Sequence, residues 1–412
     1  MSEAWGDKLS SSTSVFKIKN QGPMYLLGLG HAATHWVAGT FYVLLPFMTK
    51  DLGLSYTQAG LLVSILHISS FFANFGSGAV VDVTGRKVIF QVISLGVGGV
   101  ALLVFGFTGL YMVLCAMVAL IGATNNLWHP PAISFISDRY PENRGYALSI
   151  HATGASLGDM VAPLAAGAAI TWWSWQGSAI ANSVPVFVVT AIFLFYLMPK
   201  DTPKQAGAGS GIGFSDYLSG LAGLVRRKAV LGLCLMAALR SMAQNGLLMF
   251  LPLYLADVLQ VSPVVLGVAI AAMHLGGVIV SPIAGVLSDR IGRRPVVMSG
   301  LAATTLIVAG LTFVENTMVY VVGVSFLGFV LYAVRPVIHS WMMDMAPADV
   351  RGSATSLLFG TQAGLSVLMP VIGGAVADAY GLTEVFYVIA GIMLAANFVV
   401  FLLPRPEKDT LL

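Results

Sequence analysis

The stretch Gly78-Ala-Val-Val-Asp82-Val-Thr-Gly85-Arg86-Lys87 ends one long apolar run and turns the chain into the next. The same pattern returns 207 positions later as Gly285-Val-Leu-Ser-Asp289-Arg-Ile-Gly292-Arg293-Arg294. This offset is close to half of the 412 residues of the chain. The sequence therefore predicts two copies of one structural unit.

The composition is that of a membrane protein. Hydrophobic residues make up 57% of the chain and charged residues only 9%, whereas a soluble domain carries roughly 25% charged residues. About 20 apolar residues are needed to cross a bilayer, and the sequence offers about twelve such runs. We expect an all-α integral membrane protein with twelve transmembrane helices in two pseudo-symmetric six-helix bundles. The bundles should occupy residues 1–198 and 229–412, joined by a cytoplasmic linker at 199–228.

The cationic residues predict the orientation. All but three of the 21 Lys and Arg residues lie in the chain ends, the linker, or the loops after the second, fourth, eighth and tenth apolar runs; the exceptions are Lys50, Arg240 and Arg335. Positively charged loops stay in the cytoplasm. We therefore expect a multi-pass protein of the bacterial inner membrane, the plasma membrane, with both termini inside.

The repeat extends well beyond the opening motif. Pairs of residues match at an offset of 206 or 207: Gly60 with Gly267, His67 with His274, His129-Pro130 with Arg335-Pro336, Pro163 with Pro370, and Gly167 with Gly374. At the same offset His35 corresponds to Ser241, and Asp159 to Ser366. The two units should therefore run parallel, related by an axis along the membrane normal.

The pattern Gly-x-x-x-Asp-x-x-Gly-Arg-Lys/Arg, in two six-helix halves with a central linker, resembles the major facilitator superfamily. Within that family, Trp128-His129-Pro130 and the glycine-rich run at 146–170 are similar to bacterial drug exporters of the fosmidomycin-resistance type. The resemblance implies a transporter that works by alternating access, with the first, fourth, seventh and tenth helices lining its path.

The resemblance also implies that the opening motif is a conformational latch between the halves on the cytoplasmic side. Asp82 can accept hydrogen bonds from a facing helix N-terminus, where N–H groups are unpaired. The other interpretation is that these cationic loops only fix the topology, and the second copy could serve packing within its own half. The latch residues are Gly78, Asp82, Gly85, Arg86, Lys87, Gly285, Asp289, Gly292 and Arg293.

Charged and titratable residues inside apolar runs are costly in lipid, and therefore point to function. The runs contain Asp159, Arg240 and Arg335, and all seven histidines lie within expected helices. Several of these residues are four apart and so share a helix face. The predicted substrate-binding residues are His31, His35, Asn125, His129, Arg240, Gln244, Arg335 and His339.

The two arginines predict an anionic substrate, because a guanidinium stays charged when buried and grips carboxylate or phosphonate with two donors. An alternative is that Arg240 pairs with Asp159 as a structural or gating bridge. Arg335 precedes Pro336 and could mark a helix kink instead. His67 and His274 are interpreted as packing residues, and aromatic residues such as Trp128 could line a pocket.

Asp159 is the predicted proton carrier, because desolvation raises the pKa of a carboxyl group toward neutrality. His35 and His129 are further candidates, because imidazole titrates near physiological pH. Asp159 lies in a Gly/Pro-rich segment similar to a motif of the family's drug–proton antiporters. It departs from that motif in having Ala162, where the motif has glycine, before Pro163.

We expect a proton-coupled secondary transporter rather than an enzyme. Export of a small anionic or amphipathic compound by proton antiport is the first hypothesis. Uptake of an organic anion by symport is the alternative, and a non-transporting membrane sensor is a third. The expected partners are the small-molecule substrate, protons and membrane lipid, with no nucleic acid, and the chain is expected to be a monomer. No phosphate-binding glycine loop and no metal-ligand spacing is apparent, so no cofactor, metal or catalytic residue is predicted.

Overall fold

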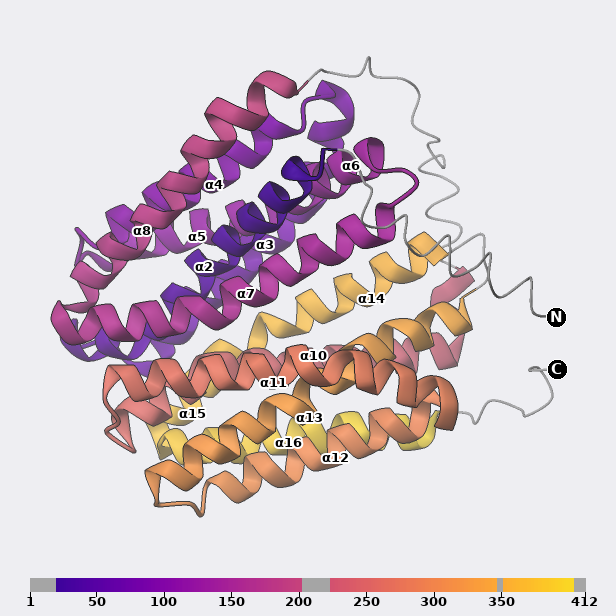
Figure 1. The fold of residues 1–412 in the computed structure, drawn as a ribbon. Helices are drawn as coiled ribbons and strands as arrows, with labels where there is room; N and C mark the ends of the chain where they lie inside the picture. The colour runs from indigo at the N-terminus through magenta and orange to yellow at the C-terminus, as the bar shows by residue number, and fades with distance from the viewer. Residues whose placement is uncertain (1–19, 202–222, 347–350, 404–412) are drawn as a thin grey trace, which may run out of the picture.

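The computed structural model of this chain describes residues 20–201, 223–346 and 351–403, and its regular structure within these ranges is helical. The predicted linker at 199–228 lies mostly outside them. The helices form two groups, one coloured indigo to magenta and one orange to yellow (Figure 1). The first group comprises α2 (Gly22–Asp51), α3 (Tyr56–Thr84), α4 (Val88–Phe105), α5 (Tyr111–Leu127), α6 (His129–Arg139), α7 (Arg144–Trp172) and α8 (Trp175–Ile192), with short π and 3₁₀ turns at Phe193–Leu197 and Met198–Lys200.

The second group comprises α10 (Lys228–Asp257), α11 (Pro263–Ile291), α12 (Arg293–Leu311), α13 (Thr317–Met345), α14 (Arg351–Ser366), α15 (Leu368–Tyr380) and α16 (Leu382–Leu402). Two expected helices are interrupted near prolines, which lack the N–H of the helical hydrogen bond. The first break separates α5 from α6 beside Pro130 and Pro131, and the second separates α14 from α15 shortly before Pro370.

Ten segments among the described residues are long and apolar enough to span a membrane, each interrupted pair counting as one. The two other long helices, α2 and α7, have 30 and 29 residues. At about 1.5 Å per residue these helices are also long enough to span. Both contain polar residues that the sequence singled out, namely His31 and His35 on α2 and Asp159 on α7, which make these helices less apolar. The all-helical membrane fold is confirmed, with ten of the twelve expected spans recognisable by composition.

Equivalent helices pack together in each group. In the first, α2 packs on α7, α3 on α5, and α4 on α8; in the second, α10 packs on α14, α11 on α13, and α12 on α16. The glycines fit this packing. A Cβ atom on Gly122 would lie 2.2 Å from the Leu66 carbonyl oxygen, and one on Gly328 would lie 2.0 Å from that of Met273. Such small residues let helix backbones approach closely in a membrane.

The two groups meet mainly through α7 with α11 and α3 with α15. These contacts lie at what we call the distal end, where α2 ends and α3 begins. A Cβ on Gly60 would lie 2.1 Å from the Pro370 oxygen, and one on Gly167 would lie 2.3 Å from the Pro263 oxygen. Asp378 adds hydrogen bonds across the same boundary to the first residues of α3, from Tyr56 N at 2.8 Å and Thr57 N at 2.9 Å.

The two copies of the opening motif lie at the opposite end, which we call the terminal end. Gly85 and Gly292 take the positive φ values of 63° and 97° that such turns require. Among the described residues, the ion pairs of the motifs stay within one group: Lys87 pairs with Asp138, and Arg293 with Asp344 and Asp289. Arg86 is exposed, and the side chain of Asp82 is outside the described part of the chain. A latch between the halves therefore stays a prediction.

Candidate functional site

Asp159 of α7 pairs with His35 of α2. The His35 Nδ1 atom lies 2.9 Å from Asp159 Oδ1, and both side chains are partly exposed, at 24% and 31%. The sequence assigned both residues to proton coupling, and the structure brings them into contact. The alternative pairing of Asp159 with Arg240 is not what the structure shows.

Close packing of two helices positions this pair. A Cβ on Gly158 would lie 2.3 Å from the Ala32 carbonyl oxygen and 2.9 Å from the His35 Cβ. One turn earlier, a Cβ on Gly154 would lie 2.0 Å from the Gly28 oxygen. The glycines therefore allow α7 to lie against α2 closely enough for Asp159 to reach His35.

Three more histidines surround the pair. The His31 Nδ1 atom is 2.7 Å from the backbone oxygen of His151, and the two rings stack with centroids 3.8 Å apart. His129, at the start of α6, lies edge-on to His31 with a centroid separation of 5.0 Å. Trp128 donates from Nε1 to His151 Nε2 at 3.0 Å. Four of the seven histidines thus form one cluster in the first half.

The interpretation of Trp128 as a pocket-lining residue is wrong. Its side chain is fully buried and packs on Phe193, while its indole nitrogen is used by His151. Sequence reasoning also left His151 out of the site. Its position on α7, eight residues before Asp159, was the available signal, since both face α2.

The equivalent contact in the second half has no charge. Ser366 Oγ lies 3.3 Å from Ser241 Oγ, and these two serines are the repeat partners of Asp159 and His35. The fold thus makes the same contact between helices twice, but only the first half places ionisable groups there.

The second half contributes a cationic cluster. Arg240 of α10 is only 3% exposed and donates from Nη2 to the Leu331 oxygen at 2.7 Å. Its Nε atom and the His339 Nε2 atom are buried and have no partner among the described residues. Arg335 of α13 is exposed and interacts electrostatically with both Arg240 and His339. Buried polar atoms without partners are rare, and each calls for an explanation such as a ligand.

The cationic cluster and the histidine cluster interact. The charge of Arg335 acts on both His129 and Asp159, and Tyr332 interacts with Asp159, Arg240 and Arg335. Arg335 of the second half thus lies near enough to the first half to attract the Asp159 carboxylate and to repel a proton on His129.

The other predicted residues take supporting places. Asn125 donates from Nδ2 to the Thr34 oxygen at 3.3 Å, and Gln244 is half-buried on α10. His67 lies 3.4 Å from the Tyr42 hydroxyl, and His274 Nδ1 is 2.9 Å from the Ile270 oxygen. These last two contacts fit the packing interpretation of His67 and His274.

Comparison with known proteins agrees with this architecture. The family model described as the Major Facilitator Superfamily matches residues 27–272 and 233–411. A multidrug resistance protein, MdtG, of Klebsiella pneumoniae (strain 342) is 25% identical over 380 residues, covering 89% of each chain. A putative metabolite transport protein of Haemophilus influenzae is 26% identical over 408 residues, covering 93% of this chain and 97% of that protein.

Solved structures show the same fold. A bacterial homologue of the human lysosomal transporter Spinster, in an inward-facing and occupied conformation, superposes with a TM-score of 0.80 at 15% identity, covering 92% of this chain and 95% of that one. The nucleoside transporter NupG superposes with a TM-score of 0.75 at 14% identity, covering 92% and 98%. With the family model matching most of its length, this chain belongs to the Major Facilitator Superfamily and is a multi-pass membrane transport protein.

Proposed function

We propose that this protein is a proton-coupled secondary transporter that exports a small anionic or amphipathic compound by proton antiport. It works as a monomer in the bacterial inner membrane, with both termini in the cytoplasm. The observation that carries the proposal is the buried Arg240, whose Nε atom has no partner among the described residues.

The chemistry of the second half favours an anion. A guanidinium binds carboxylate or phosphonate through two parallel hydrogen bonds. One donor of Arg240, Nη2, already forms a hydrogen bond to the Leu331 oxygen. Its free Nε, the unpartnered Nε2 of His339 and the charge of Arg335 are the groups that such an anion would satisfy. Asn125 and Gln244, with His31, His35 and His129, would contact the rest of the substrate.

The contacts between the halves support alternating access. Five hydrogen bonds between the two groups of described helices involve the first turns of α3 at its distal end, as in the bond from Ser64 Oγ to the Val367 oxygen. With the orientation that the cationic loops predict, the distal end is periplasmic. A substrate would then reach Arg240 from the cytoplasm, which is the loading state of an exporter.

Proton coupling is assigned to Asp159 with His35, and His129 is a further candidate. Asp159 and His35 are within hydrogen-bonding distance and partly exposed, as proton exchange requires. The antiport direction rests on the similarity to a multidrug resistance protein and on the glycine-rich segment around Asp159.

Symport of an organic anion is the second candidate, and one observation favours it. Arg335 interacts with both Asp159 and His129. A proton bound at the Asp159–His35 pair adds positive charge near Arg335 and would therefore strengthen the binding of an anion. The anion and the proton would then bind to the same state of the protein, as symport requires, rather than compete for it.

Counterflow in proteoliposomes tests the substrate class. Fosmidomycin, as an anionic phosphonate, and ethidium, as a cationic drug, are each tested with the intact protein and with Arg240→Gln. Losing a hydrogen bond to a charged group costs about 1.5–3 kcal/mol, so counterflow of the anion at low concentration should fall roughly 10- to 100-fold. Arg240→Lys should recover only part of it, because lysine lacks the two-pronged geometry.

Arg290→Gln is the matched control, since Arg290 is exposed at the end of α11. Counterflow of ethidium without any response to the anion would overturn the assignment of Arg240. The direction of the pH gradient that drives net accumulation then separates antiport from symport.

A further inference from the structure

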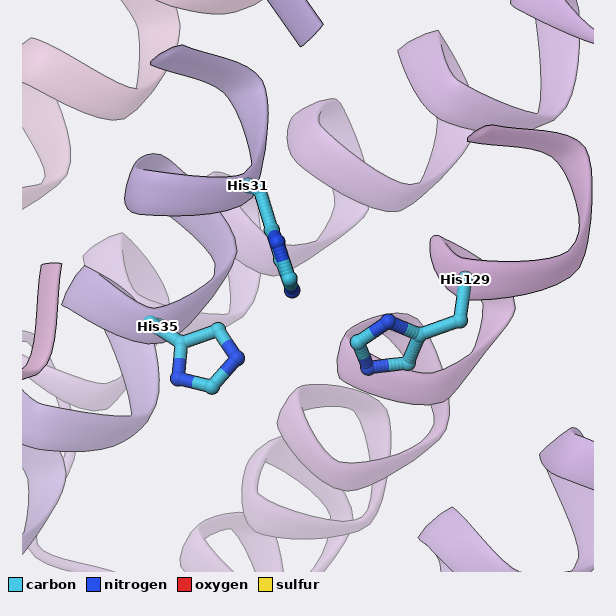
Figure 2. A group of neighbouring side chains, drawn as sticks. All are labelled: His31, His35 and His129. Carbon is cyan, nitrogen blue, oxygen red and sulfur yellow. The ribbon is translucent and has the colours of Figure 1, made fainter. Parts of the chain in front are cut away.

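Three histidines of the first half converge on one point. His31 and His35 come from successive turns of α2, and His129 reaches them from the start of α6, with the three rings directed toward one another (Figure 2). One ring nitrogen from each lies within 4.8 Å of the others. The break before Pro130 creates this meeting, because His129 begins a new helical segment there.

The hydrogen bonds of His31 fix which of its nitrogens is free. Its Nδ1 atom is 2.7 Å from the His151 carbonyl oxygen, which can only accept, so Nδ1 carries the proton of the neutral ring. The Nε2 atom is then unprotonated and has a lone pair that can bind a metal ion. It is buried in a residue 6% exposed, and has no partner among the described residues.

His35 has the same arrangement. Its Nδ1 atom is held by the carboxylate of Asp159 at 2.9 Å, which leaves Nε2 as the lone-pair nitrogen. Histidines that bind metals almost always donate their other ring N–H to a carboxylate or a backbone carbonyl, which orients the ring. His35 donates to the carboxylate of Asp159, and His31 donates to the backbone carbonyl of His151.

His151 is excluded as a ligand by the same reasoning. Its Nε2 atom accepts the indole N–H of Trp128 at 3.0 Å, so its lone pair is already used. This exclusion leaves His31, His35 and His129 as the possible ligands among the four clustered histidines.

We propose that His31, His35 and His129 form a binding site for a divalent transition metal ion of the Zn²⁺ or Co²⁺ class. Asp159 and the His151 carbonyl act as positioning groups. The proposed metal site shares His31, His35 and His129 with the proposed transport site, but its test is separate, because metal binding requires neither a substrate nor a gradient. It also revises the sequence prediction that the chain has no metal site, since only the fold brings His129 to the pair on α2.

Two of the three ring separations are close to those expected around a bound ion. With Zn–N bonds of roughly 2.0–2.1 Å in a tetrahedral site, neighbouring imidazole centroids should be about 5 Å apart. His31 lies at 4.8 Å from His35 and 5.0 Å from His129, whereas the distance between His35 and His129 is 6.4 Å. Binding therefore requires a movement of the half-buried His129 ring toward His35. Three protein ligands leave a fourth position for water or an anion.

Metal binding to the purified full-length protein tests the proposal. The protein is made with an affinity tag that contains no histidine, and is titrated with ZnCl₂ by calorimetry and with CoCl₂ by visible absorption. We expect one ion per chain and the intense visible bands of tetrahedral Co²⁺. His35→Ala and His129→Ala should each weaken Zn²⁺ binding at least tenfold, and Asp159→Asn should weaken it about 10- to 100-fold by releasing the His35 ring.

His67→Ala is the matched control, because His67 lies in a membrane helix outside the cluster. Its Zn²⁺ affinity should equal that of the unmodified protein. The proposal fails if the protein binds no Zn²⁺, or if His129→Ala binds it as tightly as the control does. His129 is only half-buried, so this variant decides the question even if substitution of His31 prevents folding.

Discussion

At the scale of single residues, the functional character lies where the two halves differ. The His35–Asp159 contact of the first half is repeated as a contact between Ser241 and Ser366 in the second. The backbone arrangement is therefore shared, but only one copy holds ionisable groups. In the second half the charge lies instead on Arg240, whose guanidinium is buried.

This asymmetry predicts the effect of Asp159→Asn. Asparagine keeps the size of the side chain, but its neutral amide holds the His35 ring less strongly than a carboxylate does, and it cannot bind and release a proton. We expect transport driven by a pH gradient to fall at least tenfold, while counterflow at equal pH continues. Both rates can be measured in the same proteoliposomes. If gradient-driven transport survives, a histidine carries the proton and Asp159 has a positioning role only.

At the scale of helices, the glycines of α7 determine whether the site can form. Gly154 and Gly158 face α2 at distances that leave no room for a side chain, so α7 and α2 touch through their backbones. This contact places His35 beside Asp159 and His31 beside His151. The packing of one helix pair thus supports every polar contact between them.

Gly158→Ala should therefore disturb both stability and the site. The added Cβ would lie 2.3 Å from the Ala32 oxygen, so the helices must move apart. Overpacking of this kind costs about 1–3 kcal/mol, which should lower the melting temperature in detergent measurably and reduce transport. Gly145→Ala on the same helix is the control, because no atom lies within 4 Å of its added Cβ. Equal melting temperatures for the two variants would contradict the packing argument.

At the scale of the whole molecule, the two halves are joined at the distal end by contacts that the repeat duplicates. Gly60 packs against Pro370, and Gly267 against Pro163. Gly60 is equivalent to Gly267 in the repeat, and Pro163 to Pro370. Each half therefore contributes one glycine and one proline carbonyl at equivalent positions of the interface. The internal repeat therefore encodes the interface between the halves as well as their folds.

Asp378 belongs to only one of the two equivalent contacts. It accepts hydrogen bonds from Tyr56 N, Thr57 N and, at 2.6 Å, Thr57 Oγ1, and so satisfies the free N–H groups at the start of α3. The residue at the equivalent position of the first half is Thr171, whose hydroxyl bonds its own helix at the Gly167 oxygen.

Asp378→Ala should therefore shift the protein toward a state with the distal end open. Each lost hydrogen bond to the carboxylate contributes about 1.5–3 kcal/mol to the closed form, enough to change the ratio of the two states tenfold or more. Spin labels at Phe107 and Phe313, which are exposed in distal loops of the two halves, report the distance by pulsed electron resonance. The native Cys115 and Cys234 are first replaced by alanine.

We expect longer distances between the labels in Asp378→Ala than in the unmodified protein. Asp51→Ala is the control, because Asp51 is a distal carboxylate whose partners among the described residues, Trp175 and Gln176, belong to its own half. If both variants lengthen the distance equally, Asp378 has no special part in closure.

The sequence alone determined the class of this protein and its internal repeat. Lipid offers no hydrogen bonds to the backbone, so apolar runs of sufficient length must become helices, and their positions can be read from composition. The matching glycines, prolines and turn motifs predicted two parallel units. The sequence also showed Arg240, Arg335 and Asp159 to be charged residues inside the apolar runs.

Only the tertiary structure decided which of these residues meet. Asp159 pairs with His35 and not with Arg240, Trp128 is buried beneath His151, and His129 joins His31 and His35. Asp378, at the end of an ordinary apolar run, links the two halves. Apart from Trp128 and His151, which are 23 positions apart, these partners are separated by more than 90 residues. Their contacts depend on how each helix is rotated and how closely its glycines let it approach, and hydrophobicity along the chain does not encode either quantity.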